Sequence, residues 1–137
     1  MTPLKLKRLL LVALAILLFA SSVAIGQRYA GPVTRSRVKF ARGRTTAVIK
    51  GIARTLGTYE YVLGVRSGQT MSVHLTSSNN GVEFSVEPPN GDSVDDALGV
   101  MDWSGELEYS GDYKILVTNN RSRVQKNPSY TLEVTIR

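Results

Sequence analysis

The sequence predicts an all-β protein, a two-sheet antiparallel β-sandwich of seven to eight short strands preceded by an N-terminal signal helix. Apolar and polar residues alternate over several short segments, as in strands with one solvated face. Clusters of Gly, Pro, Asn, Asp and Ser separate these segments, and no helical repeat of useful length follows residue 27. We therefore divide the chain into a signal peptide (1–26), a flexible arm (27–36) and a β-sandwich domain (37–137).

The N-terminal segment has the pattern of a secretory signal. Three basic residues precede an uncharged run from Leu9 to Gly26, and the small side chains of Ala24 and Gly26 fit a cleavage site before Gln27. The alternative is a retained membrane anchor, because the run is near the lower length limit of a membrane span. Under either interpretation the domain is exported, and we predict a periplasmic or secreted location, with membrane contact only through an uncleaved N-terminus.

Period-two alternation defines the strands of the domain. In Ser129–Arg137, for example, Tyr130, Leu132 and Val134 share one face while polar residues occupy the other. The predicted strands lie near residues 37–40, 45–52, 58–65, 70–76, 82–86, 105–109, 112–117 and 129–137. The Ser-Gly, Asn-Asn-Gly, Pro-Pro-Asn-Gly-Asp and Ser-Gly-Asp clusters between them provide the turn chemistry that separate strands require.

Composition excludes several kinds of chemistry. The chain contains no cysteine and one histidine, so a disulfide, a thiolate metal site, a cysteine nucleophile and a multi-histidine metal site are all impossible. Without the signal peptide, fourteen Lys and Arg oppose eleven Asp and Glu, a net charge of +3. This modest charge argues against nucleic acid as a partner.

The charges are grouped along the chain. Between Arg28 and Arg66 nine basic residues accompany a single acid, Glu60, whereas the segment from Glu83 to Asp112 contains acids and no base. One interpretation is a folded surface with regions of opposite sign, which would orient the protein toward a charged partner. The other is that neighbouring strands pair these groups across a sheet.

The candidates for catalysis are weak. His74 is on the polar face of its predicted strand, which indicates a surface residue. A carboxylate pair for glycoside hydrolysis would have to come from Asp92, Asp95, Asp96 or Asp102, in a Gly/Pro/Ser-rich connection where acids are usually solvated. We predict that the protein is not an enzyme and needs no cofactor, and we leave a weak calcium site among these acids open.

A series of landmarks along the domain resembles the bacterial periplasmic inhibitors of goose-type (g-type) lysozyme, over nearly the whole mature chain. These landmarks are Val38-Lys39-Phe40, Arg42-Gly43, Ile49-Lys50-Gly51, Tyr59-x-Tyr61, Ser67-Gly68-Gln69, Val73-x-Leu75, Pro88-Pro89 with Gly91, Ser110-Gly111-x-Tyr113, Val117, Arg121 and Tyr130-x-Leu132-x-Val134. The Gly-Gln and Ser-Gly-x-Tyr elements are also similar to the broad family of pre-peptidase C-terminal β-sandwich domains. The resemblance implies a proteinaceous inhibitor whose partner is a g-type lysozyme or a related peptidoglycan-cleaving enzyme.

The same resemblance implies which residues bind the partner. Ser110, Gly111 and Tyr113 match the Ser-Gly motif that bacterial lysozyme inhibitors share, and Arg121 matches an arginine that enters the lysozyme cleft. With Arg123, these form the predicted partner-binding set. Read from the residues alone, Gly111 and Ser110 are turn residues and Tyr113 is a core residue.

One position departs from the family pattern. The inhibitors tend to carry a second basic residue four positions after the first, where this chain has Gln125, with Arg123 or Lys126 as possible substitutes. Two other functions stay open at this point. The domain could be an envelope- or carbohydrate-binding module without an enzyme partner, or a membrane-tethered structural domain if the signal is retained.

Overall fold

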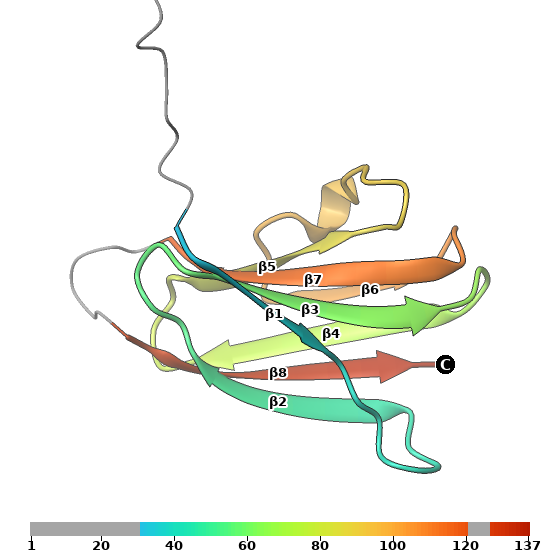
Figure 1. The fold of residues 1–137 in the computed structure, drawn as a ribbon, viewed down its shortest axis with the longest axis horizontal. Helices are drawn as coiled ribbons and strands as arrows, with labels where there is room; N and C mark the ends of the chain where they lie inside the picture. Colours follow the sequence, from blue (N-terminus) through green and yellow to red (C-terminus); the bar gives the residue numbers. More distant parts are fainter. Residues whose placement is uncertain (1–30, 121–126) are drawn as a thin grey trace, which may run out of the picture. The chain divides into compact units, whose positions relative to one another are not determined.

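Two four-stranded sheets face each other in the computed structural model, which describes residues 31–120 and 127–137 (Figure 1). The strands are β1 (Val33–Arg37), β2 (Thr46–Ile52), β3 (Thr58–Val65), β4 (Thr70–Ser77), β5 (Val82–Glu87), β6 (Asp102–Glu106), β7 (Gly111–Asn119) and β8 (Ser129–Ile136). Sheet A has the order β1-β3-β7-β5, and sheet B has the order β2-β8-β4-β6. A short 3₁₀ turn, η2 (Asp95–Ala97), precedes β6.

The predicted fold class is confirmed: the domain is an all-β sandwich with eight strands. All strand pairs are antiparallel except β1–β3, which is parallel. The predicted signal peptide and its helix lie outside the described residues, as do positions 27–30 of the predicted arm. No helix among the described residues is long and apolar enough to cross a membrane.

Two strand positions differ from the prediction. β1 begins at Val33, inside the segment 27–36 predicted as an arm, whereas the sequence placed the first strand at 37–40. All five β1 residues are exposed, so no apolar alternation marks the strand, and its pairing with β3 defines it. β6 covers Asp102–Glu106 instead of 105–109, because the buried ring of Trp103 places that residue opposite Val73.

The core lies between the sheets and consists of the apolar faces that alternation predicted. The three residues Met71, Val73 and Leu75 are at most 2% exposed, and on β8 Tyr130, Leu132 and Val134 are at most 3% exposed. On β3, Tyr61, Leu63 and Val65 are buried, while Tyr59 is partly buried. Removal of this apolar surface from water is the main favourable term in folding.

A pair of tyrosines links the two sheets inside this core. The hydroxyls of Tyr61 on β3 and Tyr130 on β8 are hydrogen-bonded, and the ring of Tyr59 lies 6.0 Å from that of Tyr130. Burial raises the pKa of both bonded hydroxyls, so both stay protonated around neutral pH. A Cβ at Gly51 would lie 2.5 Å from the Tyr130 hydroxyl, which explains why glycine occupies that position of β2.

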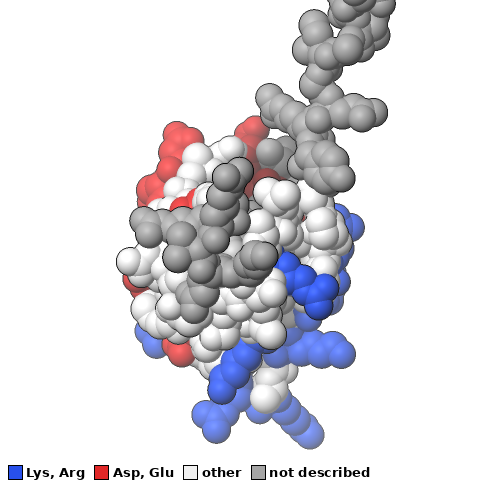
Figure 2. Space-filling view, turned by 90° about the vertical axis from the view of Figure 1, so that its left-hand side faces the viewer, with Lys and Arg blue, Asp and Glu red and all other residues white. Residues whose placement is uncertain are grey.

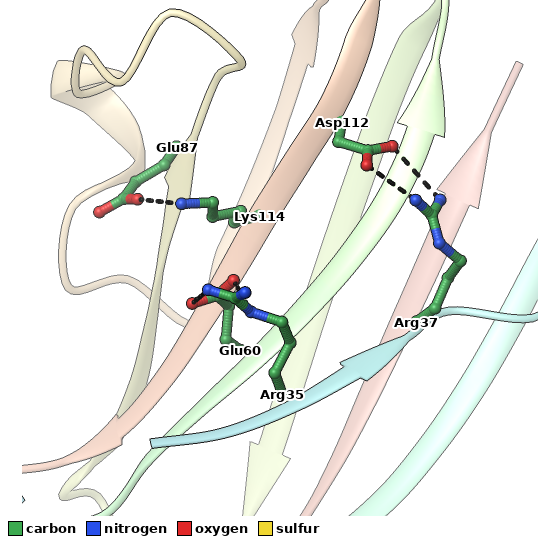
Figure 3. A network of polar contacts seen from close by, with 6 residues as sticks. All are labelled: Arg35, Arg37, Glu60, Glu87, Asp112 and Lys114. Atoms are coloured by element: carbon green, nitrogen blue, oxygen red, sulfur yellow. Dashed lines mark hydrogen bonds and ion pairs between the residues drawn. The ribbon is translucent and has the colours of Figure 1, made fainter. Parts of the chain in front are cut away.

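Three ion pairs cross the outer face of sheet A (Figure 3). Arg35 Nε lies 2.7 Å from Oε1 of the buried Glu60, but this ion pair is not a hydrogen bond. Arg35 Nη2 donates a 3.2 Å hydrogen bond to Glu60 Oε2. Arg37 forms a two-bonded contact with Asp112, at 3.3 and 2.7 Å. Lys114 Nζ is 3.9 Å from Glu87. β1 is therefore attached to sheet A by backbone pairing and by two arginines.

These two arginines differ in the burial of their partners, which predicts unequal effects on stability. Arg35→Ala leaves the Glu60 carboxylate, 7% exposed, without its cation, and we expect a loss of about 1 to 3 kcal/mol. Arg37→Ala breaks a pair in which both side chains are more than half exposed, and we expect less than about 1 kcal/mol. Urea unfolding of both variants checks the order, and equal losses would contradict it.

Candidate functional site

The two ends of the sandwich carry different candidate residues. One end, here called the Ser-Gly end, contains the turns at 66–69 and 107–110 and the C-terminus. The other, here called the arginine end, contains the turns at 53–57 and 78–81 together with Asn120 and Asn127, which flank the segment 121–126. β7 runs from the first end to the second, pairing Gly111 with Val65 and Asn119 with Val82.

The predicted partner-binding residues are thus divided between two places. Ser110 and Gly111 lie at the start of β7, and Asn120 follows its end. A strand advances about 3.4 Å per residue, so about 30 Å separate Gly111 from Asn120. Arg121 and Arg123 lie outside the described residues, but the residues that flank them are at the arginine end. The structure therefore does not place the Ser-Gly motif beside the chain that flanks the arginines.

Each described residue of the motif has a structural role. Ser110 Oγ accepts a 2.9 Å hydrogen bond from the Ser67 backbone N–H, joining two turns. Gly111 has a φ of +135°, and a Cβ there would lie 3.0 Å from Pro89 Cγ. Tyr113 is only 2% exposed, and its hydroxyl accepts the Tyr109 N–H at 3.2 Å. The motif builds this end of the sandwich, and the Tyr113 side chain belongs to the core.

At the arginine end, backbone hydrogen bonds hold Asn120, which precedes the segment 121–126, and Pro128, which lies two residues after it. The Asn120 N–H donates to Gly81 O at 2.9 Å, and the Ala53 N–H donates to Pro128 O at 2.8 Å. The side-chain amide of the buried Asn119 donates to Ala53 O at 3.2 Å. The arginine-bearing segment therefore starts and finishes on a well-connected base that includes the turn after β2.

That turn contains the one positive-φ residue other than glycine among the described residues. The Gly57 N–H donates to Arg54 O at 3.0 Å, which makes Leu56 the third residue of the turn, with a φ of +61°. Glycine or asparagine normally takes this position. A bulky L-residue in this conformation costs about 1 to 2 kcal/mol. The Leu56 side chain recovers little of that cost by burial, because it is 58% exposed.

Other apolar side chains are exposed at the same end. Val33, at the start of β1, is 57% exposed, and Ile52, at the end of β2, is 56% exposed. Arg54 is exposed and forms no ion pair with the described residues. Exposed apolar groups beside a cation are typical of protein-docking surfaces. Leu56 was not among the predicted binding residues, and the one signal for it was a Leu-Gly pair between two predicted strands.

The charge groups of the sequence occupy opposite edges of the sandwich. Figure 2, which looks onto the arginine end, shows basic side chains at the bottom and acidic ones at the top. The basic edge comprises β1, β2 and their connection, and the acidic edge comprises β5, β6 and the connection containing η2. Both earlier interpretations hold in part: Arg35, Arg37 and Lys114 pair across sheet A, while most other charges remain separated.

The described residues offer little for catalysis or metal binding. His74 lies on the outer face of sheet B, hydrogen-bonded to Asp102, with more than half of its side chain exposed. Asp96 accepts a 3.1 Å hydrogen bond from the indole of the buried Trp103. Among residues 31–120 and 127–137, no three His, Cys, Asp or Glu side chains are grouped so that they could hold a metal ion.

Comparison with solved structures finds periplasmic inhibitors of g-type lysozyme among the matches. The chain matches the periplasmic inhibitor of g-type lysozyme PliG from Aeromonas hydrophila, with a TM-score of 0.67 and 29% identity, over 77% of this chain and 98% of the other. It also matches PliG from Salmonella Typhimurium, with a TM-score of 0.59 and 26% identity, over 76% and 98%. No family model matches the chain, and no curated protein matches it in sequence.

A third match supports the fold alone. A mutant of PliG from Escherichia coli has a TM-score of 0.58 and 24% identity, over 78% of this chain and 100% of the other. In each case nearly the whole comparison protein is covered, so the similarity extends over the complete sandwich. Over about three quarters of its length, this chain is therefore a structural match to the PliG periplasmic inhibitors of g-type lysozyme.

Proposed function

We propose that the protein is a periplasmic inhibitor of a g-type lysozyme, binds its target as a folded domain and is not an enzyme. The observation that supports this most strongly is the match to the inhibitor from Aeromonas hydrophila, which covers 98% of that chain. The secretory pattern before residue 27 agrees with such a location.

We assign the contact surface to the arginine end. Lysozymes cut peptidoglycan with an acidic residue in a cleft, and a guanidinium binds a carboxylate through two parallel hydrogen bonds. Arg121 and Arg123 would supply that group from the segment after Asn120. An arginine in contact with the catalytic acid would occupy a sugar subsite and keep the acid ionised, which prevents proton donation to the glycosidic oxygen. No covalent step is needed.

Leu56 supports this assignment independently of the arginines. A glycine would occupy this turn without strain, and the mostly exposed leucine side chain contributes little to folding by burial. An apolar side chain beside a charged contact does, however, exclude water from that contact. Ser110 and Gly111 are about 30 Å from Asn120, at the other end of β7. We therefore propose that the Ser-Gly motif stabilises the domain instead of entering the same cleft.

Inhibition of peptidoglycan lysis tests the proposal. A g-type and a chicken-type lysozyme are each assayed alone and with a stoichiometric amount of the domain 27–137. We expect the g-type enzyme to be blocked and the chicken-type enzyme to keep its activity. Failure to inhibit either enzyme at micromolar excess, together with direct binding to peptidoglycan fragments, would replace this proposal with the envelope-binding module considered above.

A further inference from the structure

A groove with a volume of ≈ 500 Å³ lies at the Ser-Gly end. Its walls come from the connection between β1 and β2, the β3–β4 turn, the start of β7 and the end of β8. Phe40, Val65 and Ile136 provide an apolar lining, and each is buried or partly buried. This volume is within the range of sites that hold a small ligand or a few residues of a peptide.

Two arginines that form no ion pair within residues 31–120 and 127–137 border this groove. Arg44 and Arg66 both line it, and neither forms an ion pair with another described residue. The single acidic residue of the lining, Asp112, already has its charge compensated by the two-bonded contact with Arg37. The groove therefore combines an apolar surface with an uncompensated positive charge.

The rim of the groove is held in place by side chains. Gln69 Oε1 accepts a 2.7 Å hydrogen bond from the Arg66 backbone N–H, and Ser110 Oγ fixes the next residue, Ser67. On the opposite side, the Ile136 N–H donates to Thr45 O at 2.9 Å. A ligand would meet a largely preformed site, so little ordering entropy would oppose its binding.

We propose that this groove binds the C-terminal carboxylate of a peptide whose last residue is apolar. Arg44 and Arg66 hold the carboxylate, and Phe40, Val65 and Ile136 receive the terminal side chain. An inorganic anion would satisfy the arginines but leave the apolar lining uncovered, and an uncharged apolar ligand would leave two cations beside it unpaired. A peptide terminus supplies both features on adjacent atoms.

This site is distinct from the surface proposed for lysozyme. It lies at the other end of β7, about 30 Å from Asn120. A peptide bound in this groove should leave lysozyme inhibition unchanged. If no peptide binds here, the proposed inhibition of lysozyme is unaffected.

Calorimetry compares the binding of two probes that differ by one charge. They are acetyl-Ala-Leu as the free acid and acetyl-Ala-Leu as the C-terminal amide. We expect the acid to bind the domain and the amide to bind at least about tenfold more weakly. Arg44→Gln and Arg66→Gln should each lower the affinity for the acid by about tenfold without changing the affinity for the amide. Lys50→Gln, which removes a cation from the outer face of sheet B, serves as the matched control and should bind as wild type does.

Amide NMR locates the site in the same samples. Gly64 and Gly111, both in the lining, should shift upon addition of the acid, whereas Gly81 at the arginine end should not. Equal binding of acid and amide would overturn the proposal. So would shifts confined to other residues, an Arg66→Gln variant that binds normally, or no binding of the acid at millimolar concentration.

Discussion

Arg121→Ala is expected to abolish most of the inhibition of g-type lysozyme while leaving the domain folded. Truncation of one partner of a desolvated charge pair costs about 2 to 5 kcal/mol, a loss in affinity of about 30-fold or more. Gln125 occupies the position where a second basic residue would share the contact with the lysozyme. Arg121 should therefore contribute a larger part of the binding free energy. Titration of the lytic activity with the variant measures the inhibition constant directly.

Lys50→Ala is the control for this experiment. Lys50 is an exposed cation that forms no ion pair with another described residue, and it lies on the outer face of sheet B, away from the proposed contact. Its removal should leave the inhibition constant within a factor of two or so, as expected for an exposed charge outside the interface. If Arg121→Ala and Lys50→Ala inhibit equally well, the basic segment does not enter the cleft.

Leu56→Gly is expected to move stability and inhibition in opposite directions. Glycine accepts the positive φ of this turn without strain, which stabilises the folded state by about 1 to 2 kcal/mol. Glycine is also more flexible in the unfolded chain, which stabilises the unfolded state by about 0.5 to 1 kcal/mol. The net gain in unfolding free energy is therefore between about 0 and 1.5 kcal/mol, with a central value of about 0.7 kcal/mol. Loss of an apolar contact at the interface should weaken inhibition by about tenfold.

Val48→Ser separates this effect from a general response to losing surface hydrophobicity. Val48 is 57% exposed, nearly the same as Leu56, but it belongs to regular strand β2 and carries no backbone strain. This variant should gain no stability and should inhibit normally. Urea unfolding and the lysis assay are run on both variants. A more stable Leu56→Gly domain that inhibits fully would show that the turn is strained for a reason other than lysozyme binding.

Local alternation was sufficient to predict most strands and their buried faces. On β4 and β8, the residues predicted to face inward are the residues that the core contains, because side chains of a strand alternate whatever lies opposite. β1 could not be found this way. Its five exposed residues carry no apolar pattern, and its place depends on a parallel partner 25 residues away and on the carboxylates that receive Arg35 and Arg37.

The candidate site was only partly accessible to such reasoning. Sequence proximity suggested that Ser110, Gly111 and Arg121 act together, but a nine-residue strand places the motif and Asn120 at opposite ends of the sandwich. The exposure and strain of Leu56 arise from how β2 is connected to β3, and no residue pattern reports a backbone angle. The groove at the Ser-Gly end unites residues from four separate parts of the chain, so it exists only in the folded chain.

The sequence by itself determined the class of this protein: an all-β domain without thiol chemistry, with basic and acidic residues in separate blocks and with the landmarks of a lysozyme inhibitor. The fold class, the lack of thiols and the charge blocks are matters of composition and local periodicity, which do not depend on long-range contacts. The landmarks are short motifs that resemble those of a known family. Only the tertiary structure decided which edge each charge block occupies, that Glu60 is buried under Arg35, and which residues share an end of the sandwich. Those features follow from strand order and register, which are set by the simultaneous packing of the two sheets.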